Sequence, residues 1–237
     1  MENRKIAIVF TGIIEDYYLD EFLDIYKDCN YTKIVSTWDY IDEKIIQKLK
    51  TNNYMVVQST FPENIRKKSV NYQIWSTKIG IEFAKQNGFT HILKLRSDMP
   101  VNKINEFIGI YDSIYEEDKI IYVKHSFIGT SVPSFLCDFG LFGNIKTMEF
   151  VYSKEIYQEE NDDRFPELFL QYITFNINDI EEENFKKIKD KVIFSAMYLM
   201  NENIDFYFIK RNYENIRDIV KKHHINSITN GYKIYYM

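Results

Sequence analysis

The sequence of 237 residues predicts an α/β protein in which a mostly parallel central sheet carries helices on both faces. The first observation behind this prediction is that short apolar runs alternate four times with segments of helical periodicity. The second is that each run is followed by polar residues, as expected where parallel strands end at a ligand-binding edge. No linker interrupts the pattern, so residues 1–237 are expected to form a single domain.

The four apolar runs predict strands at residues 5–10, 33–36, 54–58 and 91–98. A helix is expected after the first strand, where Tyr18, Phe22 and Ile25 recur at three- and four-residue spacing. A second helix is expected at residues 42–50, between the second and third strands. The strand-helix alternation favours right-handed crossovers, which place all four carboxyl ends on one side of the sheet.

The longest helix of this half is expected from about residue 69 to residue 87. Trp75, Ile79 and Phe83 recur every four residues, which predicts that they share one face of this helix. Gly88 follows as a C-terminal stop, because glycine readily adopts the left-handed conformation that ends many helices.

The second half of the chain shows a less regular pattern. Residues 127–143 combine three glycines with Pro133 and predict a loop-rich passage. Pro166 suits the first turn of a helix that ends near residue 175. The other elements expected here are a helix at 102–115, a strand at 119–124, a helix at 181–200 and a strand at 204–209.

Composition narrows the class of protein. Hydrophobic residues make up 45% and charged residues 27%, as in ordinary globular proteins. The net charge of −5, without a long basic block, argues against a nucleic-acid partner. Cys29 and Cys137 form no CxxC pair, so neither a disulfide framework nor a structural zinc site is expected, and a cytoplasmic location fits best. The apolar stretches are far shorter than the roughly 20 residues of a membrane span, so membrane contact is expected to be at most peripheral.

The segment HILKLRSD, residues 91–98, brings charge to the end of a buried strand. Arg96 and Asp98 stand there beside Ser97, and two interpretations follow. They can form a local ion pair that caps the next turn, or they can bind the phosphate or metal of a ligand at the sheet edge. Neither a GxGxxG nor a GxxxxGK[ST] motif is present, so the dinucleotide and P-loop classes lack their phosphate loop.

Six strings in the chain occur in a characteristic order. They are KIAIVFTG, IVSTWD, NYQIWSTKIG, LKLRSD, CDFGLFG and FPELFL, and together they span roughly residues 5 to 175. In this order they resemble the WavE-type family of lipopolysaccharide-synthesis proteins, regarded as glycosyltransferases with a GT-A-like (Rossmann-like) fold. The resemblance implies a nucleoside-diphosphate sugar donor and a glycan or lipid-linked glycan acceptor of the cell surface, in lipopolysaccharide or capsule synthesis.

The resemblance also implies that the two halves of the chain bind different substrates. Residues 1–100 are expected to form a nucleotide-binding half and residues 101–237 an acceptor-side half, with the enzyme in the cytoplasm or at the inner face of the membrane. The donor-binding residues implied are Thr11, Gly12, Asp39, Asn71, Gln73, Lys94, Arg96 and Ser97. Tyr72 departs from the family string, which has an arginine there, and Arg66, Lys67 and Lys68 are the nearest basic substitutes.

A divalent metal, Mn²⁺ or Mg²⁺, is implied by the position of RSD, where GT-A enzymes have a DxD motif. Asp98 is the expected ligand, because hard cations prefer carboxylate oxygens. Position 96 is an arginine here, so the triplet contains a single carboxylate. His223, beside His224, is the second residue expected at the metal.

The catalytic base that an inverting enzyme needs is expected among three carboxylates of the second half. Glu167, at a helix start, is the first choice; Asp138, within CDFGLFG, and Asp163 follow. Two other functions stay open. A sugar nucleotidyltransferase would share the sheet but normally needs a glycine-rich basic loop, which GIIEDYY lacks. A non-catalytic glycan-binding or assembly partner would fit the incomplete DxD.

Overall fold

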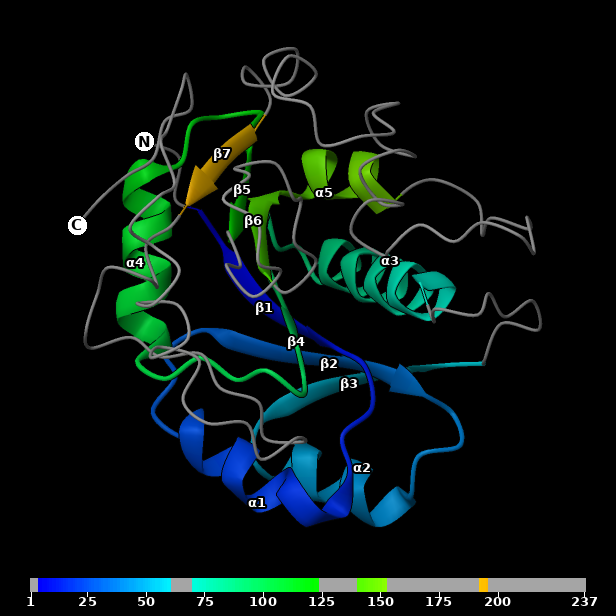
Figure 1. The fold of residues 1–237 in the computed structure, drawn as a ribbon. Coiled ribbons are helices and arrows are strands. Elements are labelled where there is room, and N and C mark those ends of the chain that lie inside the picture. The colour runs from blue at the N-terminus through cyan, green and yellow to red at the C-terminus, as the bar shows by residue number, and fades with distance from the viewer. Residues whose placement is uncertain (1–3, 61–69, 124–139, 153–191, 196–237) are drawn as a thin grey trace, which may run out of the picture.

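The central sheet of the computed structural model has seven strands in the order β3-β2-β1-β4-β6-β5-β7 (Figure 1). The structure describes residues 4–60, 70–123, 140–152 and 192–195. The strands are β1 (Ile6–Thr11), β2 (Thr32–Trp38), β3 (Tyr54–Ser59), β4 (His91–Arg96), β5 (Ile120–Val123), β6 (Gly140–Asn144) and β7 (Val192–Ser195). The pairs β1–β2, β1–β4, β2–β3 and β5–β7 are parallel, and β6 runs antiparallel to β4 and β5. The predicted mostly parallel sheet is thereby confirmed.

Helices cover both faces of the sheet, as predicted. They are α1 (Asp16–Ile25), α2 (Glu43–Thr51), α3 (Val70–Gln86), α4 (Ile104–Ile114) and α5 (Ile145–Tyr152). Figure 1 shows α1 and α2 together below the sheet, and α3 and α5 together on the opposite side. Within the described ranges, no helix is both long enough and apolar enough to cross a lipid bilayer.

Strand β1 is buried along its whole length because helices pack on both of its faces. Its alternate side chains enter two different clusters. Ile8 and Phe10 join the cluster with α1, α2 and α4, whereas Ala7 and Val9 join the cluster with α3 and α5. The Phe10 ring lies 5.0 Å from the ring of Phe22 in an edge-to-face arrangement. An unbroken apolar run is therefore the expected sequence of this central strand.

Helix α3 packs on the sheet mainly through residues outside the predicted face of Trp75, Ile79 and Phe83, of which Phe83 contacts the sheet-side core cluster. Ile74, Ile81 and Ala84 are buried against β1, β2 and β4, whereas Trp75 and Ile79 are only half-buried. Gly80 explains the choice, because a Cβ built on it would lie 2.5 Å from Cγ1 of Val9. The close approach of backbone to sheet favours the face that carries glycine and alanine over the face with the largest side chains.

Strand β6 lies in the passage that was expected to be a loop, so that prediction was wrong for residues 140–143. Its glycines do not prevent pairing, because β4 and β5 flank it and supply antiparallel ladders on both sides. Helix α5 follows directly and was not predicted. Asn144 caps it, since its side-chain Oδ1 accepts a hydrogen bond from the backbone N–H of Thr147 at 2.8 Å.

Strand β7 lies inside the segment that was expected to be a helix at residues 181–200. It pairs in parallel with β5, with Val192 opposite Ile120 and Ser195 opposite Val123. The pairing partner lies about seventy residues earlier in the chain, so a local pattern could not reveal it. The helix expected from Pro166 and the strand expected at 204–209 lie outside the described residues.

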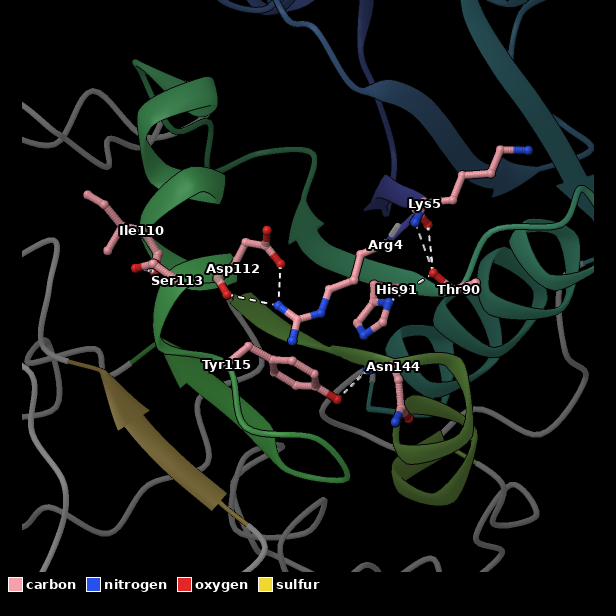
Figure 2. A network of polar contacts seen from close by, with 9 residues as sticks. All are labelled: Arg4, Lys5, Thr90, His91, Ile110, Asp112, Ser113, Tyr115 and Asn144. Atoms are coloured by element: carbon pink, nitrogen blue, oxygen red, sulfur yellow. Dashed lines mark hydrogen bonds and ion pairs between the residues drawn. The ribbon is translucent and has the colours of Figure 1, made fainter. Parts of the chain in front are cut away.

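A polar network ties the start of the chain to the second half of the sheet (Figure 2). The Arg4 guanidinium donates to Oδ1 of Asp112 on α4 at 2.6 Å and lies 4.9 Å above the ring of Tyr115. The Tyr115 hydroxyl in turn accepts a hydrogen bond from the backbone N–H of Asn144 at 3.2 Å. His91, at the first position of β4, lies edge-on to the same Tyr115 ring. These contacts fix the amino-terminal edge of the sheet, opposite the edge where the parallel strands end.

Candidate functional site

A cavity of about 320 Å³ opens at the carboxyl ends of β1, β2 and β4. The amino-terminal half of α3 forms one of its walls. The residues that line it are Thr11, Gly12, Ile13, Trp38, Tyr40, Tyr72, Gln73, Ser76, Arg96, Ser97 and Asp98. This edge is where open parallel sheets bind their ligands, because strand ends and helix starts meet there. The cavity is accordingly the candidate functional site.

The floor of the cavity consists of two turns pressed together, one after β1 and one after β4. The backbone N–H of Ser97 donates to the carbonyl of Thr11 at 3.0 Å, and its hydroxyl donates to the carbonyl of Ile13 at 2.9 Å. Gly12 lies between them with φ of +113°, a conformation that side-chain-bearing residues rarely adopt. The Tyr18 hydroxyl also donates to Ile13, and burial raises the pKa of Tyr18. These hydrogen bonds therefore hold the two turns of the floor against each other.

Arg96 and Asp98 supply the charge in the cavity. Nε of Arg96 donates to Oδ1 of Asp98 at 2.8 Å, and Nη2 donates to Oδ2 at 2.8 Å. The side chains are 25% and 19% exposed, so the pair is partly shielded from water. Such a two-point pair is stronger and more directional than a single contact. The ion pair that the sequence left as one alternative is present, and it lies in the cavity.

Three aromatic side chains, Trp38, Tyr40 and Tyr72, form an aromatic wall of the same cavity. The ring of Trp38, from the end of β2, lies 5.8 Å from the ring of Tyr72 on α3, edge to face. Tyr40 adds a third ring that is 56% exposed. Its pKa is raised by partial burial and, less strongly, by Tyr72 and Asp39. Trp38 is only 2% exposed and Tyr72 is half-buried, so Tyr40 is the exposed ring of this wall. Exposed aromatic faces bind flat rings such as nucleobases by stacking.

Helix α3 reaches this wall because it packs so close to the sheet. The Ser36 hydroxyl donates to the carbonyl of Ser76 at 2.6 Å, which joins β2 to the middle of the helix. Gly80, one turn further on, makes the near contact with Val9. The first turns of α3 therefore stand over the strand ends, where Tyr72 and Gln73 line the cavity. The first turn contains no acidic residue, so no acidic side chain of that turn offsets the positive end of the helix dipole.

Most of the predicted donor-binding residues meet in this cavity. Those that line it are Thr11, Gly12, Gln73, Arg96 and Ser97, together with the predicted metal ligand Asp98. The structure brings them from three separate segments, the turn after β1, the start of α3 and the turn after β4. Their roles as ligand-binding residues stay predictions.

Three predicted donor-binding residues do not line the cavity. Asp39 is exposed beyond the end of β2, where its backbone N–H donates to the carbonyl of Ser59 at 3.1 Å. Asn71 is buried in the first turn of α3, one residue before Tyr72. Lys94 lies on the same face of β4 as Arg96 but two residues deeper, and it is fully buried. The predicted catalytic residues Glu167, Asp138 and Asp163, the histidine His223 and the basic run 66–68 lie outside the described residues.

The aromatic residues that line the cavity were not among the predicted donor-binding residues. Tyr40 and Tyr72 line the cavity, and Tyr72 stands where the family string has an arginine. Trp38 was noted only as the end of a strand. The available signal was the position of Trp38 directly after an apolar run, since polar and aromatic residues at that point face the ligand edge.

A divalent cation does not fit the donor set that the structure describes. Among the described residues that line the cavity, Asp98 is the only carboxylate. Both of its oxygens accept hydrogen bonds from Arg96. No group of three or more His, Cys, Asp and Glu side chains arranged for a metal occurs within the described ranges. Mg²⁺ and Mn²⁺ usually need several oxygen ligands, so Asp98 does not by itself make a metal site.

Comparison with protein-family models and with curated proteins found no significant match to the sequence. Solved structures do match. The Staphylococcus aureus TarS fragment 1–349, in complex with UDP-GlcNAc, aligns with a TM-score of 0.52 and 16% identity. The alignment covers 90% of this chain and 60% of that one.

Two further solved structures align over most of both chains. A glycosyltransferase involved in the glycosylation of the major capsid of PBCV-1 has a TM-score of 0.48 and 12% identity, covering 92% of this chain and 97% of that one. A cytidylyltransferase from Leptospira borgpetersenii has a TM-score of 0.48 and 17% identity, covering 81% and 76%. At these identities the likeness concerns the fold alone. The chain has the Rossmann-like α/β fold found in the TarS fragment, and no family match supports the WavE-type resemblance.

Proposed function

We propose that the protein is a glycosyltransferase that binds a nucleoside-diphosphate sugar in the cavity at the ends of β1, β2 and β4. The observation that carries this proposal is the pairing of Arg96 with an aromatic wall in one cavity of about 320 Å³. A guanidinium suits a diphosphate, and aromatic faces suit a nucleobase. A nucleotide sugar contains both groups, a diphosphate and a nucleobase, joined through a ribose. The fold shared with a TarS fragment that binds UDP-GlcNAc supports the same class of donor.

In this proposal each part of the cavity has a role. The Tyr40 and Tyr72 rings stack against the base, the buried Trp38 ring supports Tyr72, and Gln73 contacts the ribose or phosphate. The floor turns at Gly12 and Ser97 set how deep the donor enters. Cleavage of the sugar–phosphate bond builds negative charge on the leaving diphosphate, and a fixed cation stabilises that charge in the transition state. Arg96 is the only cationic side chain among the described residues that line the cavity.

The remaining parts of the proposal extend beyond the described residues. The acceptor is a cell-surface glycan of lipopolysaccharide or capsule synthesis, as the WavE-type resemblance implies, and the enzyme acts in the cytoplasm or at the inner face of the membrane. Residues 1–100 form the nucleotide-binding half and residues 101–237 the acceptor-side half of one domain. Glu167 acts as the catalytic base, with Asp138 and Asp163 as the alternatives. A contribution of Mn²⁺ or Mg²⁺ through Asp98 and His223 is part of the family pattern, but the described donor set gives it no support.

Isothermal titration of the full chain with UDP, GDP, CDP and ADP, each with and without Mn²⁺, tests the proposal. At least one nucleotide is expected to bind. Tyr40→Ala is expected to weaken that binding by about tenfold or more, because Tyr40 is the exposed ring of the cavity and base stacking on an aromatic ring contributes roughly 1–3 kcal/mol. Phe150→Ala is the matched control, since Phe150 is an exposed aromatic residue on α5 that does not line the cavity.

Two results would contradict the proposal. If no nucleotide binds under either condition, the cavity is not the site of a nucleotide-sugar donor. Release of pyrophosphate from a nucleoside triphosphate and a sugar phosphate, with no sugar transfer from any nucleotide sugar, would assign the cavity to a sugar nucleotidyltransferase instead.

A further inference from the structure

The charged pair at the end of β4 leads to a more specific conclusion about how the cavity holds a diphosphate. We propose that the Arg96 guanidinium binds the diphosphate directly, without a divalent cation on Asp98, and that Asp98 is a positioning residue for Arg96. This inference rests on the proposed nucleotide-sugar site. It reverses the role that Asp98 has in the family pattern, where the carboxylate would face a metal.

The geometry of Asp98 is the first argument. Its two oxygens face the Nε and Nη2 atoms of Arg96, each at 2.8 Å. A divalent cation on the same oxygens would stand next to the guanidinium and repel it. Removing Arg96 from Asp98 to make room would in turn cost a partly buried, two-point ion pair. A divalent cation and Arg96 would therefore compete for the same two oxygens of Asp98.

The chemistry of the guanidinium is the second argument. Arginine presents donors on two edges of a planar fork, and Asp98 engages the edge formed by Nε and Nη2. Nη1 belongs to the other edge, so a phosphate oxygen bonded to that edge does not have to displace Asp98. The resulting arrangement, with carboxylate on one side and phosphate on the other, keeps the cation between two anions.

The surroundings of the pair supply further positive potential. Arg96 and Asp98 together are neutral, so a diphosphate needs more than this pair. Helix α3 is 17 residues long and has no acidic side chain in its first turn, and Gln73 and Ser76 from its first two turns line the same cavity. Backbone N–H groups at a helix start attract anions through the helix dipole. The cavity thus combines a fixed guanidinium with the positive end of a long helix.

The role of Asp98 follows from the cost of ordering a long side chain. An arginine that is free to rotate loses conformational entropy when it binds a ligand, and this loss weakens binding. The two hydrogen bonds to Asp98 hold the guanidinium in one orientation before the ligand arrives. Loss of Asp98 is therefore expected to weaken binding moderately, whereas loss of Arg96 removes the contact itself.

The experiment measures UDP, GDP, CDP and ADP binding to the full chain by isothermal titration, in EDTA and in Mn²⁺. For the nucleotide that binds, the dissociation constants in EDTA and in Mn²⁺ are expected to agree within about threefold, since no metal-bridged contact exists to lose. Arg96→Ala is expected to weaken binding by about tenfold or more in both conditions, and Arg96→Lys by less, because it keeps the charge without the fork. Asp98→Asn, which keeps the shape, is expected to weaken binding by about three- to tenfold in both conditions.

Titration of Mn²⁺ alone, followed by electron paramagnetic resonance, gives a second measurement. No Mn²⁺ site that depends on Asp98 is expected, with or without the nucleotide. Circular dichroism and thermal unfolding establish that each variant is folded. If Arg96→Ala does not fold, Arg96→Lys and the wild-type comparison between EDTA and Mn²⁺ still decide the question.

The possible results separate this inference from the proposed function. Binding that weakens by more than about tenfold in EDTA, returns with Mn²⁺ and loses this response in Asp98→Asn would overturn the inference and leave the nucleotide site intact. Absence of nucleotide binding by the wild-type chain in both conditions would overturn the proposed function, and this inference with it.

Discussion

The turns that contain Gly12 and Ser97 meet at the floor of the cavity, where the Ser97 hydroxyl donates to the carbonyl of Ile13, 84 residues earlier in the chain. A Cβ at position 12 would lie 3.1 Å from Oγ of Ser97, and the φ of Gly12 is +113°. The turn after β1 therefore needs glycine for both its conformation and its proximity to the turn after β4. The same two turns form the surface on which a ligand at the sheet edge would rest.

The first prediction follows from this contact. Gly12→Ala is expected to lower the free energy of unfolding by about 1–3 kcal/mol, because alanine is strained at this φ and its methyl group crowds Ser97. Nucleotide binding is expected to weaken as well, since the floor must shift. Urea denaturation measures the first effect and isothermal titration the second.

Gly109→Ala is the matched control for this substitution. Gly109 lies on α4, and nothing lies within 4 Å of a Cβ built there. This variant is expected to be as stable as the wild type or more stable by about 0.5–1 kcal/mol, because alanine favours a helix over glycine. Equal stability of Gly12→Ala and wild type would show that the floor tolerates a side chain.

The second prediction concerns the approach of α3 to the sheet. Gly80→Ala is expected to destabilise the protein by about 1–3 kcal/mol, because the new methyl group would lie 2.5 Å from Cγ1 of Val9. Replacing Val9 by alanine in the same chain is expected to recover part of the lost stability, since it removes the Cγ1 atom that the new methyl group would crowd. A double-mutant cycle followed by urea denaturation measures the coupling. Additive effects of the two substitutions would contradict the close contact.

The third prediction is a dependence of stability on pH that originates at His91. This side chain is 6% exposed, and within the described residues its Nε2 has no hydrogen-bond partner. Burial lowers its pKa, and Glu117 opposes the shift. Of the neighbours drawn in Figure 2, Arg4 reinforces the shift and Asp112 opposes it. The unfolded chain therefore binds a proton at a higher pH than the folded chain. Stability from the neutral ring is complete above the unfolded pKa of about 6.5 and is lost as pH falls below it.

His91→Phe tests this dependence. A phenyl ring suits the site, since the imidazole stacks near Phe142 at 6.2 Å and lies edge-on to Tyr115 at 5.2 Å. The variant is expected to lose less stability than the wild type between pH about 6.5 and 5, because it has no proton to bind there. Thermal unfolding across this pH range provides the comparison. Parallel profiles for both proteins would exclude His91 as the source.

The fourth prediction concerns the Arg4–Asp112 pair at the amino-terminal edge. The side chains are 26% and 41% exposed, and the Arg4 guanidinium also lies over the Tyr115 ring. A double-mutant cycle with Arg4→Ala and Asp112→Ala is expected to give a coupling of about 0.5–1 kcal/mol that decreases in high salt. The Lys27–Asp24 pair, with side chains 62% and 72% exposed, is the control and is expected to couple weakly. Equal coupling for the two pairs would contradict a special role for Arg4.

The sequence alone determined the first half of the fold. The four apolar runs became β1 to β4, and Ile45, Ile46 and Leu49 face the core from α2, because each of these elements is specified by its own local pattern. Gly88 follows α3 with φ of +74°, as its position predicted. Local sequence patterns are enough to predict these elements, because the periodicity of their side chains and the residues of their turns depend only on neighbours in the chain.

Elements specified by distant partners could not be predicted in this way. Strand β6 contains two glycines and pairs with β4 and β5, and β7 pairs with β5 from far along the chain. The face of α3 was also decided by contact, since Gly80 lies against Val9, whereas the larger Trp75 is only half-buried. Strand pairing and close packing are tertiary effects, and they overrode local propensity at these places.

The same division applies to the site. The sequence placed Arg96 and Asp98 at the end of a buried strand and left open whether they cap a turn or face a ligand. Only the tertiary structure shows that they pair with each other at 2.8 Å and also line a cavity that Trp38 and Tyr72 share. It also leaves Lys94 fully buried, although the pleat puts it on the same face as Arg96. Periodicity predicts the face of the sheet on which a side chain lies. How deeply the side chain is buried depends on the tertiary packing of helices against that face.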